Sequence, residues 1–408
     1  MAYGSLTNMA VPEKTILFQQ EPDGTTYRIP SLIFIKSTST FLAFAEQRSS
    51  PDDADAKCLV MRQGHQNGNS VQWDDMRVMS DAQLQGYRTM NPCPVFDEDE
   101  GVLFLFFVCI KKHVTECWQL FTGKNAAKLC YITSKDHGKT WSRAIDLTED
   151  VIGDEIVNWA TFAVGPGHGI QLESGRLIIP AYTYYIYCPS CFCGFNSSKP
   201  HSFTFYSDDH GNTWQMGKLI DNIKTVECEM AEIKCQSGMN VLYCSSRTPL
   251  HYRAEAFSQN EGNEFVGAIL NEKLVEPPSG CQGSVISFQL PEKYTLVQEE
   301  KHISMKETTP VIDCSGSHPD ASLSWLLFSH PTSKEERLDL GIYLNQSPLD
   351  ASKWSSPWII NFGPSGYSDL VNCEGKFACL FECSDQSIQE IIAFTVFTYS
   401  DLKKGIKI

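Results

Sequence analysis

The chain has 408 residues, of which 42% are hydrophobic and 11% aromatic, and its formal net charge is −16. A charge this negative argues against nucleic acid as a partner and against docking through a broad basic face. No run of 18 apolar residues occurs, so no membrane-spanning helix is predicted. Residues 1–10 lack the apolar core of a secretory signal, which predicts that the 16 cysteines are mostly reduced, buried thiols.

Short runs rich in β-branched and aromatic residues recur along the chain, with Gly, Pro and Asp clusters between them, and this pattern predicts many short strands. These runs cover residues 27–35, 41–44, 102–110, 129–133, 176–182, 203–206, 241–244, 283–288, 325–328, 377–381 and 391–397. No long stretch has a 3.6-residue period, so helices should be few and short. The polar stretch at about 291–324 is predicted to be a surface-loop insertion in a single domain that spans residues 1–408.

One eight-residue turn motif occurs twice, as S-K-D-H-G-K-T-W at 134–141 and as S-D-D-H-G-N-T-W at 207–214. A weaker third copy, S-Q-N-E-G-N-E-F, occurs at 258–265. The Asp of each full copy suits a turn whose backbone it binds, the Gly supplies a positive φ, and the Trp offers a ring to bury. A repeated turn in a strand-rich chain indicates a repeated β unit, and so predicts an all-β propeller. Six blades of about 65 residues would use the whole chain, although three turns do not fix the number.

The repeated turns resemble the Asp-boxes of the sialidases, and residues 27–30 (Y-R-I-P) resemble the Arg-Ile-Pro motif of that family. The resemblance continues through residues 44–48, 89–93, 114–116, 180–182, 280–283 and 366–370. Residues 169–172, 182–186 and 341–345 are most similar to the membrane-associated, ganglioside-cleaving branch of the vertebrate exo-α-sialidases. The resemblance implies a six-bladed β-propeller and a retaining exo-α-sialidase that hydrolyses terminal sialic acid from gangliosides and other sialoglycoconjugates. It also implies that no metal and no cofactor is needed.

Three arginines of the family bind the substrate carboxylate, and Arg28, Arg247 and Arg337 match them. Planar guanidinium groups bind carboxylates in a bidentate manner, so a local cluster would let a negatively charged protein hold an anion. The alternative is a set of unrelated surface ion pairs, above all for Arg337 with its acidic neighbours at 335, 336 and 339.

Tyr367 matches the tyrosine nucleophile that distinguishes sialidases from most retaining glycosidases. The negative charge of a carboxylate nucleophile would be repelled by the substrate's own carboxylate, whereas a neutral phenol would not be repelled. A phenol has a pKa near 10 and needs a base, and Glu227 matches that role. Without the family, Tyr367 would be interpreted as an ordinary loop aromatic.

The acid/base should be an aspartate of the loop at 50–55, and counting without a gap from the motif at 44–48 selects Asp53. Asp52 is the alternative if the register slips by one residue, and a solvated acidic turn is the non-catalytic interpretation. The family implies binding or orienting roles for a further set of residues: Arg48, Met90, Asn91, Glu116, Tyr182, Tyr184, Gln282, Glu46 and Glu382.

Residues 184–195 combine aromatic side chains with Cys188, Cys191 and Cys193. Four interpretations remain: a zinc site completed by His201, buried thiols, an acylated site, or an aromatic wedge that meets a membrane. The cysteine separations are not those of a standard zinc pair, so zinc is the least favoured. The segment and the resemblance predict a peripheral protein of the plasma membrane and endosomes, without a transmembrane helix, and a cytoplasmic enzyme is the alternative.

Two other functions compete with the enzyme. A sialic-acid-binding propeller lectin would keep the arginines but lose the tyrosine, its glutamate or the acid, and all three are present. A propeller scaffold for protein interactions would need only the repeated turns, and the three arginines argue against it.

Overall fold

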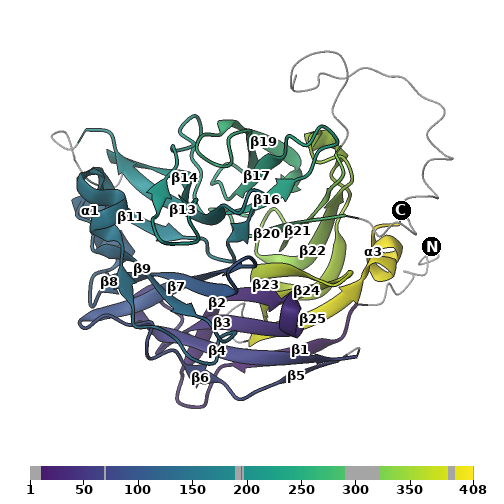
Figure 1. Cartoon of the computed structure of the whole chain (residues 1–408), viewed down its shortest axis with the longest axis horizontal. Helices are drawn as coiled ribbons and strands as arrows, with labels where there is room; N and C mark the ends of the chain where they lie inside the picture. Colours follow the sequence, from purple (N-terminus) through teal and green to yellow (C-terminus); the bar gives the residue numbers. More distant parts are fainter. Residues whose placement is uncertain are drawn as a thin grey trace.

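The computed structural model describes residues 11–68, 70–188, 194, 197–289, 322–384 and 391–407. In this part of the chain, strands β1 to β25 form five antiparallel sheets. Figure 1 shows these sheets arranged around a common centre, in a propeller-like, all-β architecture. The predicted all-β class and propeller arrangement are therefore confirmed at this level.

Four of the sheets follow one another along the chain. The first contains β2 (Thr26–Ile35), β3 (Thr40–Arg48), β4 (Ala56–Asn67), β5 (Ser70–Trp73) and β6 (Arg77–Val78). The second contains β7 (Tyr87–Asp97), β8 (Val102–Lys111), β9 (Ala127–Ser134) and β10 (Ile145–Asp146). The third contains β11 (Trp159–Val164), β12 (Ile170–Gln171), β13 (Leu177–Ile186), β14 (Ser198–Ser207) and β15 (Gln215–Met216). The fourth contains β16 (Cys228–Ile233), β17 (Val241–Ser246), β18 (Tyr252–Ser258) and β19 (Val266–Val275).

The fifth sheet has seven strands, because one long strand belongs to two groups of neighbours. Its strands are β20 (Ser284–Phe288), β21 (Trp325–Pro331), β22 (Leu338–Asn345), β23 (Trp358–Cys373), β24 (Lys376–Cys383), β25 (Ile391–Thr398) and β1 (Lys14–Gln19). The first part of β23 pairs with β22, and its last part pairs with β24. Six blades were expected, and five sheets are found because hydrogen bonding is continuous through β23. Strand β1 pairs with β25, so the two ends of the chain close the ring.

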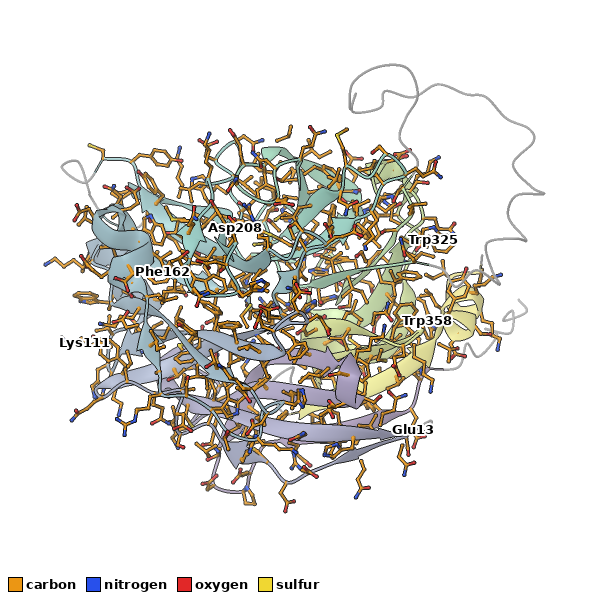
Figure 2. The ribbon with its side chains drawn as sticks, viewed as in Figure 1. Glu13, Lys111, Phe162, Asp208, Trp325 and Trp358 are labelled. Carbon is orange, nitrogen blue, oxygen red and sulfur yellow. The ribbon has the colours of Figure 1, made fainter. Side chains whose placement is uncertain are left out.

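Helices are few and short in the described residues, as predicted. They are α1 (Glu116–Thr122), α3 (Tyr399–Ile406), the 3₁₀ segments η1 (Lys36–Thr38), η2 (Asp53–Asp55), η4 (Gly153–Asn158) and η7 (Ala351–Lys353), and the short π-helix η3 (Thr148–Ile152). Helix α3 begins with a capping box between Thr398 and Asp401. It packs on Trp358, which Figure 2 labels beside it, and a Cβ at Gly405 would come within 2.3 Å of the indole ring.

Each repeated turn follows the third long strand of its sheet and also contacts the sheet before it. In the first copy, Asp136 accepts from the backbone N–H and the hydroxyl of Thr140, at 2.9 and 2.6 Å. Trp141 then packs on Phe44 of the first sheet, with ring centroids 6.2 Å apart. In the second copy, Trp214 packs on Phe106 of the second sheet at 4.6 Å. The turn therefore fastens one sheet to its neighbour, which is a scaffold role.

Most of the polar segment predicted to be a loop insertion at about 291–324 lies outside the described residues, which resume at residue 322. No helix among the described residues has both the length and the apolar character needed to cross a bilayer.

Candidate active site

The predicted site residues are far apart in sequence, and they lie on strands of different sheets, or directly beside them, in the ring that Figure 1 shows. Tyr367 lies in β23, Glu227 directly precedes β16, and Arg28 lies in β2. Arg247 follows β17 and Arg337 precedes β22.

Tyr367 is the meeting point of these side chains. Its hydroxyl donates to Oε1 of Glu227 at 2.5 Å and accepts from Nη1 of Arg247 at 2.9 Å. The guanidinium carbons of Arg28 and Arg337 lie 5.3 and 5.4 Å from the centroid of its ring. Three guanidinium groups and one carboxylate thus face a single phenol.

Burial and the neighbouring Glu227 hold the pKa of Tyr367 well above its usual value, although Arg247, Arg337 and Arg28 act in the opposite direction. The phenol is therefore protonated at neutral pH. It would become a nucleophile only by passing its proton to a partner at reaction time, and the Glu227 carboxylate is in hydrogen-bonding contact with it.

Hydrogen bonds to neighbouring residues fix the positions of Arg28 and Arg247. The Glu382 carboxylate accepts from Nε and Nη2 of Arg28 at 3.2 and 3.3 Å. Arg247 donates from Nη1 to Glu227 at 2.7 Å and from Nε to the Ser279 carbonyl at 2.9 Å. Fixing the guanidinium planes in this way lowers the entropy lost when a planar anion binds.

Arg337 does not fit the surface ion-pair interpretation. Among the described residues, no acidic side chain forms a salt bridge with it, and its Nη2 donates to the Gly280 carbonyl at 3.0 Å. Asp339, one of its acidic neighbours in sequence, instead accepts from the Gly363 backbone N–H at 2.7 Å. The guanidinium of Arg337 instead faces the Tyr367 ring, 5.4 Å from its centroid.

The acidic loop places its two candidate aspartates differently. Asp52 caps η2, since its side chain accepts from the Ala54 backbone N–H at 2.8 Å. Asp53 turns toward the arginines, with Oδ1 2.5 Å from Nη1 of Arg48 and 3.8 Å from Nη1 of Arg28. Burial acts to raise the pKa of Asp53, but Arg48 and Arg28 outweigh it, and the net effect is a lowered pKa.

Several predicted binding residues lie beside this group. Tyr182 and Tyr184 alternate along β13, with ring centroids 6.3 Å apart. Glu116 is the first residue of α1, and the nearby Tyr184 side chain acts to lower the pKa of its carboxyl group. Desolvation, with the negative charges of Asp53 and Glu227, raises the pKa of Glu116 to about 7, although the side chain remains open to solvent.

Glu46 and Arg48 form a buried pair at the end of β3, with Oε2 of Glu46 2.6 Å from Nη2 of Arg48. The other carboxylate oxygen of Glu46 accepts from the Asn91 backbone N–H at 2.7 Å. Asn91 has a φ of 57°, and its neighbour Met90 is buried. Gln282 is also buried, and its amide bonds to Pro166, Glu229 and Ser368 inside the protein. The substrate-binding roles of Met90, Asn91 and Gln282 stay predictions.

Irregular backbone accompanies the site residues on three inner strands. The strand register shifts between Arg28 and Ser31 in β2, between Met90 and Cys93 in β7, and between Ser365 and Ser368 in β23. Bulges of this kind re-aim side chains and are common beside functional sites. Ile29 is in the left-handed region at a φ of 60°, which is costly for a β-branched residue.

A buried polar cluster that includes Asp369, two residues after Tyr367, was missed by sequence reasoning. His168 Nδ1 lies 2.7 Å from Oδ1 of Asp369, and the Glu229 carboxylate is 3.9 Å from the same nitrogen. Burial, with the Asp369 charge, raises the pKa of Glu229 well above its usual value. The sequence offered one signal for this cluster. Glu229 is the second glutamate of V-E-C-E-M, and alternate residues of an extended chain point to the same side, so Glu229 should lie on the side of Glu227.

The zinc interpretation of the cysteine-rich segment is not supported. Nδ1 of His201 contacts the Ile220 carbonyl at 2.9 Å and its Nε2 contacts the Tyr187 hydroxyl at 2.9 Å, so both ring nitrogens are engaged. Cys188 is disulfide-bonded, an outcome that none of the four interpretations of this segment included. Cys191 and Cys193 lie outside the described residues, so the acylation and membrane interpretations of this segment remain predictions.

The chain matches known proteins over almost its full length. A family model described as a BNR repeat-like domain matches residues 39–379. Sialidase-3 of Homo sapiens is 52% identical over 403 residues, covering 95% of this chain and 92% of that protein. Sialidase-2 of Cricetulus griseus is 40% identical over 398 residues, covering 95% and 96%.

Solved structures agree in fold. The Hadza microbial sialidase Hz136 superposes with a TM-score of 0.71 at 21% identity, covering 95% of this chain and 68% of that one. The Trypanosoma rangeli sialidase in complex with 2,3-difluorosialic acid, a covalent intermediate, superposes with a TM-score of 0.64 at 15% identity, covering 96% and 59%. With the matches in sequence over about 95% of its length, this chain belongs to the sialidase family.

Proposed function

We propose that this protein is a retaining exo-α-sialidase, a glycoside hydrolase that removes terminal sialic acid from gangliosides and other sialoglycoconjugates. The observation that carries the proposal is the Tyr367 phenol, which faces three guanidinium groups and donates to a carboxylate. The high identity to proteins named Sialidase-3 supports both the activity and the ganglioside preference.

The arginines Arg28, Arg247 and Arg337 would bind the carboxylate on the anomeric carbon of sialic acid. Each charge-assisted hydrogen bond contributes roughly 1.5–3 kcal/mol, enough for a local cluster to hold an anion against the net charge of −16. The bound carboxylate would then lie close to the Tyr367 ring, with the anomeric carbon within reach of its hydroxyl oxygen.

In the first step, the Tyr367 oxygen attacks the anomeric carbon while its proton moves to Glu227. Asp53 donates a proton to the departing glycosidic oxygen, and a glycosyl–tyrosine bond replaces the glycosidic bond. In the second step, Asp53 takes a proton from water, the hydroxide attacks the anomeric carbon, and Tyr367 recovers its proton from Glu227. Two inversions leave the configuration retained.

Asp53 must hold a proton to act as an acid, yet its pKa is lowered in the free protein by Arg48 and Arg28. An arriving substrate carboxylate would neutralise part of the Arg28 charge. Substrate binding would therefore raise the pKa of Asp53 and prepare it for proton donation. The charges of the site support this order of events, with binding before protonation.

The seven-stranded sheet supports a count of six blades, because β23 ends one group of four strands and begins the next. The repeated turns correspond to the family's Asp-boxes. We also propose that the protein meets a membrane surface without spanning it. Recovery in the soluble fraction of expressing cells, without carbonate treatment, would contradict this.

Turnover of a fluorogenic sialoside by the purified protein tests the enzymatic proposal. An NMR time course should show the α-anomer of sialic acid as the first product. Tight binding of sialosides without turnover would instead identify the lectin.

A further inference from the structure

Regular sheet pairing breaks at the strand that carries Tyr367. The β23–β24 register runs from Ser365 paired with Cys383 directly to Ser368 paired with Phe381, so a bulge contains Gly366 and Tyr367. Backbone groups at a bulge lose their regular ladder partners and need others when they are buried.

Two side chains bind the backbone at Tyr367 and at Ser368, the residue that follows the bulge. Oε2 of Glu382 accepts from the Tyr367 backbone N–H at 3.1 Å. The side-chain amide of Gln282 binds both backbone groups of the next residue, Ser368. Its Oε1 accepts from the Ser368 N–H at 3.0 Å, and its Nε2 donates to the Ser368 carbonyl at 3.0 Å. A side-chain amide that both donates and accepts thus imitates a neighbouring strand at this one residue.

Gln282 in turn is held by Glu229. Oε1 of Glu229 accepts from Nε2 of Gln282 at 3.2 Å, and its Oε2 accepts from the Val285 backbone N–H at 3.0 Å. Glu229 itself is fully buried, and a Cβ at Gly167 would lie 1.6 Å from its Oε1, so the carboxylate is closely packed. No other orientation of the Gln282 amide satisfies both Ser368 groups.

We propose that Glu229 is a positioning residue for the nucleophile, acting through Gln282 on the peptide that follows Tyr367. The inference rests on the proposed function, since it assumes that Tyr367 attacks the substrate. Glu229 makes no contact with Tyr367 that would give it a chemical role. It fixes the backbone from which the phenol extends, and a displacement of about 1 Å at a reacting atom costs about 10²-fold in rate.

Glu229→Gln tests the proposal. The variant keeps the volume but sets an NH₂ group against either the Gln282 amide or the Val285 N–H, donor against donor. The matched control is Glu255→Gln, since Glu255 is an equally buried glutamate that accepts from Tyr243 and Trp354 and contacts none of the predicted site residues.

The measurements are kcat, KM and the rate at which 2,3-difluorosialic acid labels Tyr367. We expect Glu229→Gln to lower kcat and the labelling rate about 10- to 100-fold, with KM changed less than about threefold. Glu255→Gln should change neither. In a Gln282→Ala background, Glu229→Gln should have no further effect, because the two residues act in series.

A folded Glu229→Gln protein labelled at the wild-type rate would overturn the proposal, and so would a raised KM with unchanged kcat, which would indicate a substrate contact. If Glu229→Gln does not fold, Gln282→Asn gives the same test, since its amide is one methylene too short to reach Ser368. Failure of the wild-type protein itself to be labelled would refute the nucleophile assignment instead.

Discussion

Tyr367→Phe removes one oxygen from the centre of the site. In the variant, Glu227 loses the phenol donor but keeps Nη1 of Arg247 at 2.7 Å, so its charge stays paired. The variant lacks two charge-assisted hydrogen bonds, so the free energy of unfolding should fall by up to roughly 3–6 kcal/mol. The melting temperature should therefore drop by a few degrees, and the protein should remain folded.

The effect on catalysis should be far larger. Without the hydroxyl no glycosyl–tyrosine bond forms, and kcat should fall by at least roughly 10³-fold, or more than about 4 kcal/mol of barrier. Glu227→Gln should lose nearly as much, and the double variant should lose little more than either single variant, because the pair acts as a unit.

The assay is steady-state hydrolysis of a fluorogenic sialoside, with melting temperatures measured in parallel. Tyr243→Phe is the matched control: the Tyr243 hydroxyl donates to a buried glutamate, Glu255, at 2.7 Å, outside the predicted site residues. It should show a smaller stability loss, because one hydrogen bond is removed and not two, and normal turnover. Near-wild-type activity of Tyr367→Phe would remove the tyrosine from the mechanism.

Further predictions concern the acid, the arginines, metals and pH. Asp53→Ala should lower turnover of natural glycosides about 10²–10⁴-fold and much less with a good leaving group; the same pattern in Asp52→Ala would show a register error. Arg337→Lys should raise KM for sialosides, because a lysine cannot bind a carboxylate in a bidentate manner; an unchanged KM would exclude it from the carboxylate site. EDTA should leave activity intact, and a loss that zinc restores would reveal a metal site. The pKa of Glu116 is raised from 4.5 to about 7 in the folded protein. Between about pH 4.5 and 7 the folded protein therefore keeps a proton that the unfolded chain releases, and the free energy of unfolding falls as the pH rises through this range. Glu116→Gln should therefore melt higher than wild type at pH 8 but not at pH 4, and equal melting at both would contradict the shift.

Sequence patterns predicted the local features well, because these depend on neighbouring residues. The hydrophobic run at 102–110 corresponds to β8 (Val102–Lys111). The turn at 134–141 has hydrogen bonds between Asp136 and Thr140, as its sequence predicts. The types of residue needed to bind an anion and to attack the anomeric carbon were also recognisable, although only through the family resemblance.

Tertiary structure decided what depends on residues that are distant in the chain. Tyr367 and Glu227 are 140 positions apart, and only the closed ring of sheets brings their oxygens to 2.5 Å. The bulge at Gly366 and the bridging role of β23 arise from pairing between strands, which a single strand's composition does not encode. Glu229 looks like one more strand residue in the sequence, and its contact with Gln282 exists because two sheets meet at the centre of the ring.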